Sequence, residues 1–457
     1  MTKYKAYPEY KDSGIEWLGE LPNHWTTLAI KHVAQLNPSK SCVSIEKMKG
    51  MCSFIPMEKL KFNSLSLDEI KDVPDVYNGY TYFENEDILV AKVTPCFENK
   101  NMVVAHDLHN GIGFGSSEIY VLRCNDIIKN DFLFYRLQED NFMSIAEGAM
   151  TGAGGLKRVP SEVLNNFKFG LPGKKEQSII VDFLKHETAK IDNLIEKQQQ
   201  LIELLKEKRQ AVISHAVTKG LNPDAPMKDS GVEWLGKVPE HWEVSKFGYI
   251  SLVVRGGSPR PAGDPTLFNG DYSPWVTVAE ITKDNEIYLD STDTFLTKKG
   301  SEQCRVFKAG TLLISNSGAT LGVPKILNID ANANDGVVGF ELLNIDHEYA
   351  YFYLSTLTIN LRESIKQGSG QPNLNTDIVK SIAIPIPPEK EIQQIVSFIK
   401  ETIKLYLSME SGAMEQVKLL QERRTALISG AVTGKIDVRD WVSPDMHDIE
   451  ALQEATV

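Results

Sequence analysis

The sequence predicts an α+β fold, in which two globular domains are joined by two long helices. Three observations support this prediction: a short tryptophan motif occurs twice, a segment that favours helix occurs twice, and two different β-rich segments lie between these repeats. The order of motif, globular segment and long helix is therefore repeated, so one duplicated frame carries two diverged inserts. The predicted divisions are a first globular domain with its motif (1–170), a central long helix (171–222), a second globular domain with its motif (223–387), a C-terminal long helix (388–436) and an acidic tail (437–457).

The first element of each half is the tryptophan motif. Lys11–Trp25 returns as Lys228–Trp242 at an offset of 217, with 11 of 15 positions identical. Large aromatic side chains bury much apolar area, so we expect the four motif tryptophans to attach the start of each half to a globular domain or a helix. The alternative is an interface with a partner. The four residues are Trp17, Trp25, Trp234 and Trp242.

The inserts follow, at about 26–161 and 243–377, and they show no evident similarity to each other. Each mixes short apolar runs with turn residues and has one helical pattern near its end, which is typical of an α+β domain. The predicted strands are 88–93, 119–122, 311–315 and 337–340, the predicted helices are 131–146 and 348–365, and the Gly-rich turns are 152–155 and 368–370.

The long helix closes each half. Residues 175–218 match 390–433 at a constant offset of 215, without a gap, and no proline occurs from Lys174 to Lys219. At about 1.5 Å per residue, each helix is roughly 60 Å long, whereas a domain of 100 residues spans only about 26 Å. We therefore expect each helix to protrude and pair with its equal-length copy. The alternative is a helix that packs only on its own domain.

Composition limits the class of protein. The formal net charge of −12, from 61 acidic and 49 basic residues, argues against a protein that coats nucleic acid by bulk attraction, but allows a specific binder with local basic surfaces. The five cysteines form no C-x-x-C pair, so neither a disulfide framework nor a zinc ribbon is expected. Without an apolar leader or a long apolar segment, we expect a soluble cytoplasmic protein that does not contact a membrane.

The sequence also lacks the patterns of a catalytic centre. Neither a phosphate-binding G-x-x-x-x-G-K-[ST] loop, nor H-E-x-x-H, nor an amino-methyltransferase signature occurs, so we expect no catalytic residue, no metal site and no bound cofactor. A loose nuclease pattern, Pro74-Asp75 with Glu98-Asn-Lys100, could hold Mg²⁺. Its gap is elastic and its residues are common, so we interpret it as a chance match.

The combined motifs resemble a known family. The tryptophan motif, the duplication and the long helix ending in Ala211-Val-Ile-Ser-His-Ala-Val-Thr218 together resemble the specificity subunit of type I restriction-modification systems, over nearly the whole chain. The first insert ends in Gly152–Val159, which departs from that family's domain ending. The segments similar to its target recognition domains are Asp87–Lys100, Gly113–Arg123, Arg255–Pro261, Ser315–Thr320, Asn334–Phe340 and Gly368–Asn375.

The resemblance implies a subunit without a catalytic centre. It implies two target recognition domains that each read one half of a bipartite double-stranded DNA site, and two long antiparallel helices related by an internal pseudo-two-fold repeat. Two methyltransferase (modification) subunits that bind S-adenosylmethionine are the implied partners, and restriction subunits that use ATP and Mg²⁺ can join them. The alternative is a two-headed, non-catalytic scaffold that does not bind DNA, which the repeats alone support equally well.

Candidate DNA contacts lie in the polar loops of both inserts. Arg and Lys pair favourably with guanine and with phosphate, and Asn and Gln pair with adenine. Each of these residues could instead cap a turn or face solvent. Because the chain is acidic, we expect weak DNA binding by the isolated chain and tight binding only with the methyltransferase subunits. The candidates are Lys92, Thr94, Asn99, Lys100, Ser116, Lys157 and Arg158 in the first domain, and Arg255, Ser258, Arg260, Ser315, Asn316, Lys325, Gln371 and Asn373 in the second.

Overall fold

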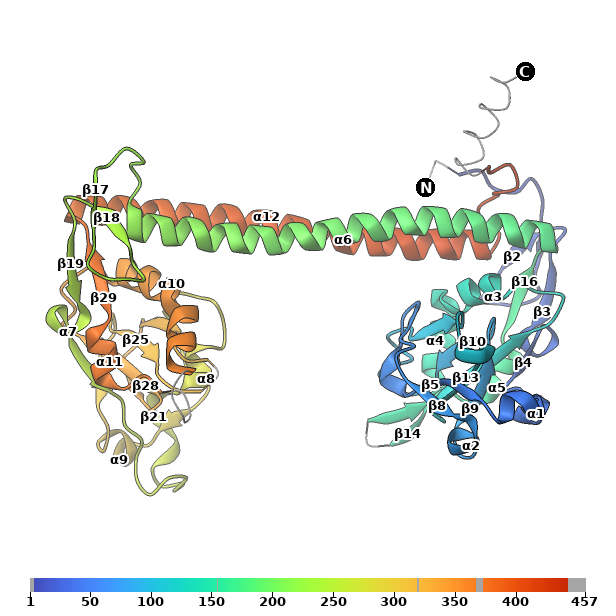
Figure 1. Ribbon diagram of the computed structural model, residues 1–457, viewed down its shortest axis with the longest axis horizontal. Helices are drawn as coiled ribbons and strands as arrows, with labels where there is room; N and C mark the ends of the chain where they lie inside the picture. Colours follow the sequence, from blue (N-terminus) through green and yellow to red (C-terminus); the bar gives the residue numbers. More distant parts are fainter. Residues whose placement is uncertain (1–3, 154, 319, 367–372, 443–457) are drawn as a thin grey trace, which may run out of the picture. The chain divides into compact units, whose positions relative to one another are not determined.

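The computed structural model describes residues 4–153, 155–318, 320–366 and 373–442. The chain forms two compact units, Met1–Gln198 with Glu415–Val457, and Gln199–Met414. Each unit contains one globular domain, one tryptophan motif and part of both long helices (Figure 1). The α+β class predicted from the sequence is confirmed.

The first unit begins with the tryptophan motif, which forms a hairpin of β1 (Tyr10–Asp12) and β2 (Glu20–Pro22). The chain then enters β3 (Thr26–Ala29), which pairs antiparallel with β16 (Lys168–Leu171), the last strand of the domain. Because β16 leads directly into the long helix, this strand pair connects both ends of the insert to the frame.

Two four-stranded sheets form the body of the first domain. Their orders are β11-β10-β13-β4 and β8-β5-β12-β9, and the only parallel pair among these described strands is β5 with β12. All four residues of β10 are buried, as expected for an uninterrupted apolar run in a central strand. The bounds are β4 (Ala34–Leu36), β5 (Met51–Ile55), β8 (Ile70–Asp72), β9 (Thr81–Glu84), β10 (Ile88–Ala91), β11 (Met102–Val104), β12 (Ile112–Gly115) and β13 (Ile119–Cys124).

Short elements complete the first domain. The sequence predicted one helix at 131–146, but the structure has α3 (Asn130–Leu137) and α4 (Asp140–Gly148), because the backbone is extended at Glu139. The others are η1 (Ile30–His32), η2 (Lys40–Cys42), α1 (Ile45–Met48), η3 (Met57–Lys59), β6 (Leu60–Lys61), β7 (Ser64–Leu65), α2 (Val73–Val76), η4 (His109–Gly111), β14 (Thr151–Ala153), β15 (Leu156–Arg158) and α5 (Ser161–Asn166).

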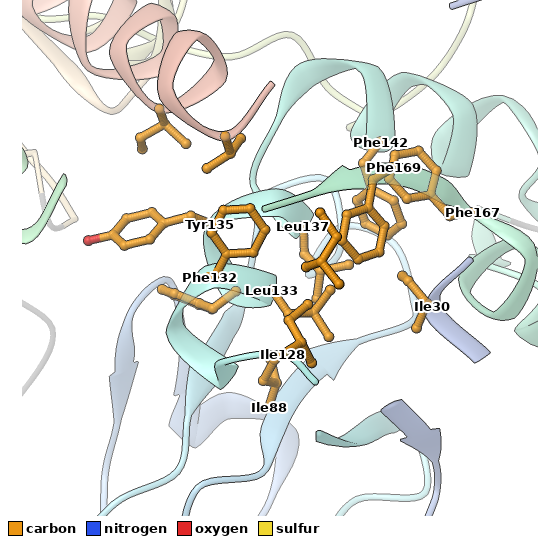
Figure 2. Close-up of a cluster of buried hydrophobic side chains, with 14 of the residues drawn as sticks. Ile30, Ile88, Ile128, Phe132, Leu133, Tyr135, Leu137, Phe142, Phe167 and Phe169 are labelled. Carbon is orange, nitrogen blue, oxygen red and sulfur yellow. The ribbon is translucent and has the colours of Figure 1, made fainter. Parts of the chain in front are cut away.

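The core of the first unit lies where α3 and α4 pack between the central sheet and the frame. Phe132 and Leu133 of α3 belong to one buried cluster with Ile88 of the sheet, and Phe142 of α4 makes an edge-on ring contact with Phe167 at 4.9 Å (Figure 2). The same cluster includes the first turns of the long helix that follows the domain. The insert and the frame therefore share one hydrophobic core.

The second unit is built in the same order. β17 (Met227–Asp229) and β18 (Lys237–Pro239) form the motif hairpin, and β19 (Glu243–Lys246) pairs antiparallel with β29 (Ala383–Ile386). The other bounds are α7 (Phe247–Ile250), β20 (Leu252–Arg255), β21 (Phe268–Val276), α8 (Val278–Ile281), β22 (Tyr288–Leu289), β23 (Phe295–Leu296), α9 (Lys298–Ser301), β24 (Val306–Phe307), β25 (Leu312–Ser315), β26 (Pro324–Leu327), β27 (Ala331–Ala333), β28 (Val337–Glu341), α10 (His347–Lys366) and α11 (Thr376–Ser381).

The two domains share one topology although their sequences show no evident similarity. The second has sheets of order β20-β28-β25-β26-β22 and β23-β21-β27-β24, which repeat the first domain's strand orders and directions with β22 added at one edge. The parallel pair of β5 and β12 recurs as β21 and β27. The two sequences do not show this likeness, because many different alternations or runs of apolar residues can form the same strand.

The two long helices have almost the predicted bounds. α6 spans Lys174–Lys219 and α12 spans Glu389–Val432. In the first unit, Ile180 and Ile191 of α6 share a core with the last turns of α12. In the second unit, the last turns of α6 share a core with Ile395 and Ile399 of α12. The helices therefore pair antiparallel in each unit, as predicted.

Repeated arginines form ion pairs between the two helices. In the second unit, Arg209 Nη1 lies 3.0 Å from Glu410 Oε1, and the Glu410 side chain is buried. In the first unit, Arg424 Nε donates to Asp192 Oδ1 at 2.8 Å. Arg209 and Arg424 are equivalent in the 215-residue repeat. A displacement of one helix turn would separate these charges, so the pairs favour one register of the helix pair.

The two kinds of repeat meet at the start of each long helix. In the first unit, Glu176 is the third residue of α6, and its carboxylate accepts a hydrogen bond from Trp25 Nε1 at 3.1 Å and lies 2.8 Å from His24 Nε2. The second unit repeats both distances with Glu391, the third residue of α12, and the motif residues Trp242 and His241. The carboxylate also lies in the first helical turn, where the helix dipole favours negative charge.

Glycines end both helices beside the same tryptophans. Gly220 directly follows α6 and has a φ of +78°. Gly434 lies two residues after the end of α12 and has a φ of +75°. A Cβ at Gly220 would lie 3.2 Å from the Trp242 ring, and one at Gly434 would lie 2.4 Å from Pro22. Both positions therefore require glycine for the left-handed backbone and for the close approach.

The motif tryptophans are not equivalent in burial. Trp25 and Trp242 are fully buried, and Trp17 stacks on Phe167 at 4.8 Å, so the prediction of core packing is confirmed for these three. Trp234 is 46% exposed. Its ring lies 6.2 Å from Tyr353, so packing covers only part of the indole.

Two classes of site or segment are absent from the described part of the chain. Among residues 4–442, apart from the gaps named above, no helix is long and apolar enough to cross a membrane. The same residues contain no group of three or more His, Cys, Asp or Glu side chains placed to hold a metal ion.

An ion pair lies inside the first core. The side chains of Arg136 and Glu139 are 0% and 1% exposed, and Arg136 Nη1 lies 3.3 Å from Glu139 Oε2. The guanidinium lies over the rings of Phe167 and Phe169 and, among the described residues, has no hydrogen-bond partner. Burial lowers the pKa of Arg136. Arg136 is therefore held by packing and by one long ion-pair contact, whereas Glu139 Oε1 also accepts a hydrogen bond from Asn141 Nδ2 at 2.8 Å.

We expect Arg136→Ala to lower the free energy of unfolding by about 3–5 kcal/mol, because it leaves the Glu139 carboxylate buried without a counter-charge. The double variant Arg136→Met, Glu139→Leu should be at least as stable as the wild type, since it removes both charges and keeps the volume. Denaturant unfolding of the single and double variants checks both statements. A double variant as unstable as Arg136→Ala would contradict them.

We expect Glu391→Ala to lower the free energy of unfolding by about 2 kcal/mol, because the buried Trp242 indole N–H loses its charged acceptor. Glu389→Ala, an exposed change two residues earlier in the same helical turn, is the matched control and should change stability by less than about 0.5 kcal/mol. Urea unfolding monitored by circular dichroism measures both. Equal stability of the two variants would show that the contact does not support the fold.

Candidate nucleic-acid interface

Three loop segments meet at one end of the central strand pair in the first domain. We call residues 92–94, 116–118 and 157–159 the first loop cluster. Backbone hydrogen bonds join them: Lys92 N donates to Glu118 O at 3.0 Å, and Val159 N donates to Lys92 O at 2.9 Å. The cluster is therefore a rigid continuation of β10 and β13.

The second domain has an equivalent group of segments. We call residues 316–318, 334–336 and 373–374 the second loop cluster. Asn316 N donates to Gly336 O at 2.9 Å, and Leu374 N donates to Asn316 O at 2.8 Å. Both clusters follow the same strand register, because Ala91 lies opposite Ile119 in one domain and Ser315 lies opposite Val337 in the other.

This register places candidates from the two domains at matching positions. Lys92 and Asn316 are each the first residue after the central strand. Arg158 forms a backbone bridge with Val93, and Asn373 forms the matching bridge with Ser317. Different side chains therefore occupy the same backbone positions, as expected of two readers built on one scaffold.

Glu118 organises the charges of the first loop cluster. Its carboxylate accepts from Arg158 Nε at 3.0 Å and from Arg158 Nη2 at 2.7 Å, and Lys92 Nζ lies 3.8 Å away. The hydrogen bond from Arg158 holds the pKa of Glu118 below its usual range. Glu118 is not among the contacts predicted from the sequence, although its place in Ser116-Ser-Glu118, just before a predicted strand, is a signal that the sequence contains.

The β14–β15 hairpin carries Lys157 and Arg158. Thr94 attaches it to the cluster, because Thr94 Oγ1 donates to Gly155 O at 2.8 Å and accepts from Lys157 N at 3.0 Å. A Cβ at Gly152 would lie 2.2 Å from Leu156 O, so the hairpin requires glycine there. Lys157 and Arg158 are exposed on this hairpin, in position to contact a ligand.

The other first-domain candidates have different surroundings. Ser116 Oγ accepts from Glu118 N at 3.2 Å and so shapes the turn of the cluster. Lys100 Nζ donates to Gln138 O at 2.8 Å and to Asp140 Oδ1 at 3.2 Å, so its charge is paired at the start of α4, outside the cluster. Asn99 lies beside it and is exposed.

In the second domain, Asp335 is the common partner. Arg255 Nε donates to its carbonyl at 2.6 Å, and Ser258 Oγ donates to its carboxylate at 2.9 Å. The backbone passes close by, because a Cβ at Gly256 would lie 2.3 Å from Asn334 O. The segment that begins at Arg255 therefore runs along the turn of the second loop cluster.

Three second-domain candidates are buried, which corrects their assignment as direct contacts. Ser315 Oγ donates to Thr320 O at 2.7 Å, Asn316 Nδ2 donates to Asp335 O at 3.2 Å, and Lys325 pairs with Asp284. Their side chains are at most 1% exposed. Polar groups that are buried and bonded within the protein hold the loops in place instead of facing a ligand.

The remaining candidates keep an accessible side chain or lie beyond the description. Arg260 is exposed, and its backbone N donates to Gln303 Oε1 at 3.0 Å. Asn373 is also exposed. Gln371 and the Gly-rich turn at 368–370 lie outside the described residues.

The arrangement suits sequence-specific recognition of a polyanion. Each domain presents exposed guanidinium groups on a rigid pair of sheets, next to amide and hydroxyl groups that can donate and accept. Guanidinium groups contact phosphates and guanine, and amides contact adenine. Direct contact by Lys92, Thr94, Asn99, Ser116, Lys157, Arg158, Arg255, Ser258, Arg260 and Asn373 stays a prediction.

Solved structures with this fold support the architecture. A solved chain from work on complex assembly and conformational transition of the type I R-M system has a TM-score of 0.72 at 15% identity, over 90% of this chain and 98% of that one. The HsdS subunit from Thermoanaerobacter tengcongensis has a TM-score of 0.54 at 16% identity, over 91% and 98%. At these identities the likeness concerns the fold alone.

Sequence relatives point the same way. The chain is 35% identical over 215 residues to the type I restriction enzyme EcoAI specificity subunit of Escherichia coli, across 45% of this chain and 36% of that relative. It spans little more than a third of the length of the first curated relatives it matches. The model of the type I restriction modification DNA specificity domain matches residues 22–204 and 239–419. Because these matches take up well over half of the sequence, the chain belongs to the type I restriction modification DNA specificity domain family.

Proposed function

We propose that this chain is the specificity subunit of a type I restriction-modification system, in which each domain reads one half of a bipartite double-stranded DNA site. The observation that carries the proposal is the pair of loop clusters. Two domains of one topology bring different exposed side chains, Arg158 in the first and Asn373 in the second, to the same backbone position. Two asymmetric half-sites require two such different readers.

The proposed subunit is non-catalytic and works through partners. Two methyltransferase subunits that bind S-adenosylmethionine would modify the site, and restriction subunits that use ATP and Mg²⁺ would cleave DNA. Apolar side chains on the long helices supply a surface for such partners. In the second unit, Leu204 of α6 and Leu405 and Met409 of α12 are about half exposed. Exposed apolar stripes of this kind are typical of protein interfaces.

The rival hypothesis is a two-headed scaffold that does not bind DNA. The frame supports it as well, but the loop clusters do not favour it. A scaffold has no need for Arg158 and Arg255, two exposed arginines that are each hydrogen-bonded to a residue of a loop cluster. The names of the relatives also favour a role in DNA specificity.

Deletion of the gene should abolish one split adenine-methylation motif in the host genome, because the methyltransferase subunits lose the subunit that selects their site. Complementation with the wild-type gene should restore the same motif. Single-molecule methylome sequencing measures both outcomes. An unchanged methylome in a host that expresses the chain would contradict the proposed function.

Arg260→Ala should weaken binding to the cognate site by about tenfold, the effect of losing one bidentate base contact or one phosphate contact. The complex with the methyltransferase subunits is titrated with cognate duplex at several salt concentrations. A phosphate contact predicts a salt slope reduced by about one, and a base contact predicts an unchanged slope. Lys246→Ala, an exposed change in β19 of the frame, is the control. Equal affinity of both variants would remove Arg260 from the interface.

A further inference from the structure

Both domains place an acidic residue in the same turn of the fold. Glu118 lies in the turn between β12 and β13, and Asp335 lies in the turn between β27 and β28. These strand pairs are equivalent in the shared topology. The two acids differ by one residue in register, since Glu118 directly precedes its strand and Asp335 comes two residues before its own. Sequence similarity does not explain the coincidence, because the inserts have none.

Each acid accepts a hydrogen bond from a side chain that is a candidate DNA contact. In the first domain, the two hydrogen bonds from Arg158 to Glu118 fix the guanidinium plane, and Lys92 lies over the Tyr120 ring with its Nζ 3.8 Å from the same carboxylate. Arg158 is also tied through its backbone to Val93. An exposed arginine would otherwise sample many rotamers, so these bonds reduce the entropy lost when it meets a ligand.

In the second domain the acid binds a different kind of side chain. The Asp335 carboxylate accepts from Ser258 Oγ, while its backbone carbonyl accepts from Arg255 Nε. The carbonyl also accepts from the buried amide of Asn316, which fixes the turn itself. Arg255 is therefore oriented by the backbone carbonyl of Asp335, whereas the carboxylate orients the hydroxyl of Ser258.

A carboxylate beside an arginine that contacts DNA weakens binding to phosphate and can favour binding to a base. It repels phosphate, and it competes with phosphate for the same guanidinium. A non-specific contact, in which only a backbone phosphate reaches the arginine, gains little binding free energy by displacing the carboxylate. A base edge in the correct position can accept from the pre-oriented arginine and donate to the carboxylate, since cytosine N4 pairs with Glu or Asp.

We propose that Glu118 and Asp335 are specificity-determining positioning residues of the two recognition domains. The Glu118 carboxylate orients Arg158, the Asp335 carboxylate orients Ser258, and each carboxylate weakens contact with non-cognate DNA. The proposal rests on the proposed function of this chain. It also assigns each acid to one half-site, because each belongs to one domain.

The test uses the complex with the methyltransferase subunits and duplexes that carry one mismatch in either half-site. With Glu118→Gln, discrimination against mismatches in one half-site should fall by about tenfold, and the other half-site should be read as before. Affinity for random-sequence duplex should rise, and its salt slope should steepen by about one, because the freed arginine reaches a phosphate. Asp335→Asn should lower discrimination at the opposite half-site.

Control variants separate this role from a structural one. Glu20→Gln in β2 and Glu243→Gln in β19 remove exposed acids from the frame and should change neither discrimination nor salt slope. Arg158→Gln combined with Glu118→Gln should bind random-sequence duplex with the wild-type salt slope, because no freed guanidinium remains. An increase of the slope that persists without Arg158 would overturn the proposal for Glu118.

The outcomes also separate the two hypotheses. A wild-type complex that does not discriminate between cognate and mismatched duplexes would overturn the proposed function. A wild-type complex that discriminates, together with Glu118→Gln and Asp335→Asn variants that discriminate equally well, would overturn only the role of the acids. Equal loss of affinity for cognate and random duplexes at an unchanged salt slope would indicate a structural role and would likewise overturn it.

Discussion

The hydrogen bonds from a His–Trp pair to a glutamate in the first helical turn are the constraint on which each half of the molecule depends. Glu176 and Glu391 receive these bonds at the point where the insert has just ended and the long helix begins. The same tryptophans contact the glycine that follows the other helix. One contact in each half thus fixes the positions of three elements: the motif before the insert, the helix after it and the end of the paired helix.

The insert is consequently fixed at both ends, and its interior can vary. β3 pairs with β16, and β19 pairs with β29, so the chain enters and leaves each domain through one strand pair. Between these points the two domains keep strand order and direction, which depend on backbone hydrogen bonds and apolar burial, not on particular side chains. Specific residues are needed again only at the loop clusters, where the fold brings three separate segments together.

The sequence predicted the frame better than the site. The predicted bounds of the long helices, 171–222 and 388–436, differ from those of α6 and α12 by at most four residues, because a 46-residue helix without proline carries a strong periodic signal and is followed by Gly220. The strands at Ile88 and Val337 were also predicted from apolar runs. Site residues were harder, since burial depends on register. Lys325 was predicted to be accessible, yet it lies in β26, whose four residues are all buried, and it pairs with Asp284.

The glutamate contact at each helix start also affects how such a protein can evolve. The residues that hold the frame, Glu391 or Trp242 for example, are not part of the loop clusters. Each loop cluster gives one side chain to a shared hydrophobic core, Val159 or Leu374, whereas Arg158 and Asn373 are exposed. Substitutions that change Arg158 or Asn373 therefore leave folding stability largely intact. Selection can accept many such changes before the protein unfolds, so new binding preferences can arise in one domain while the other keeps its own.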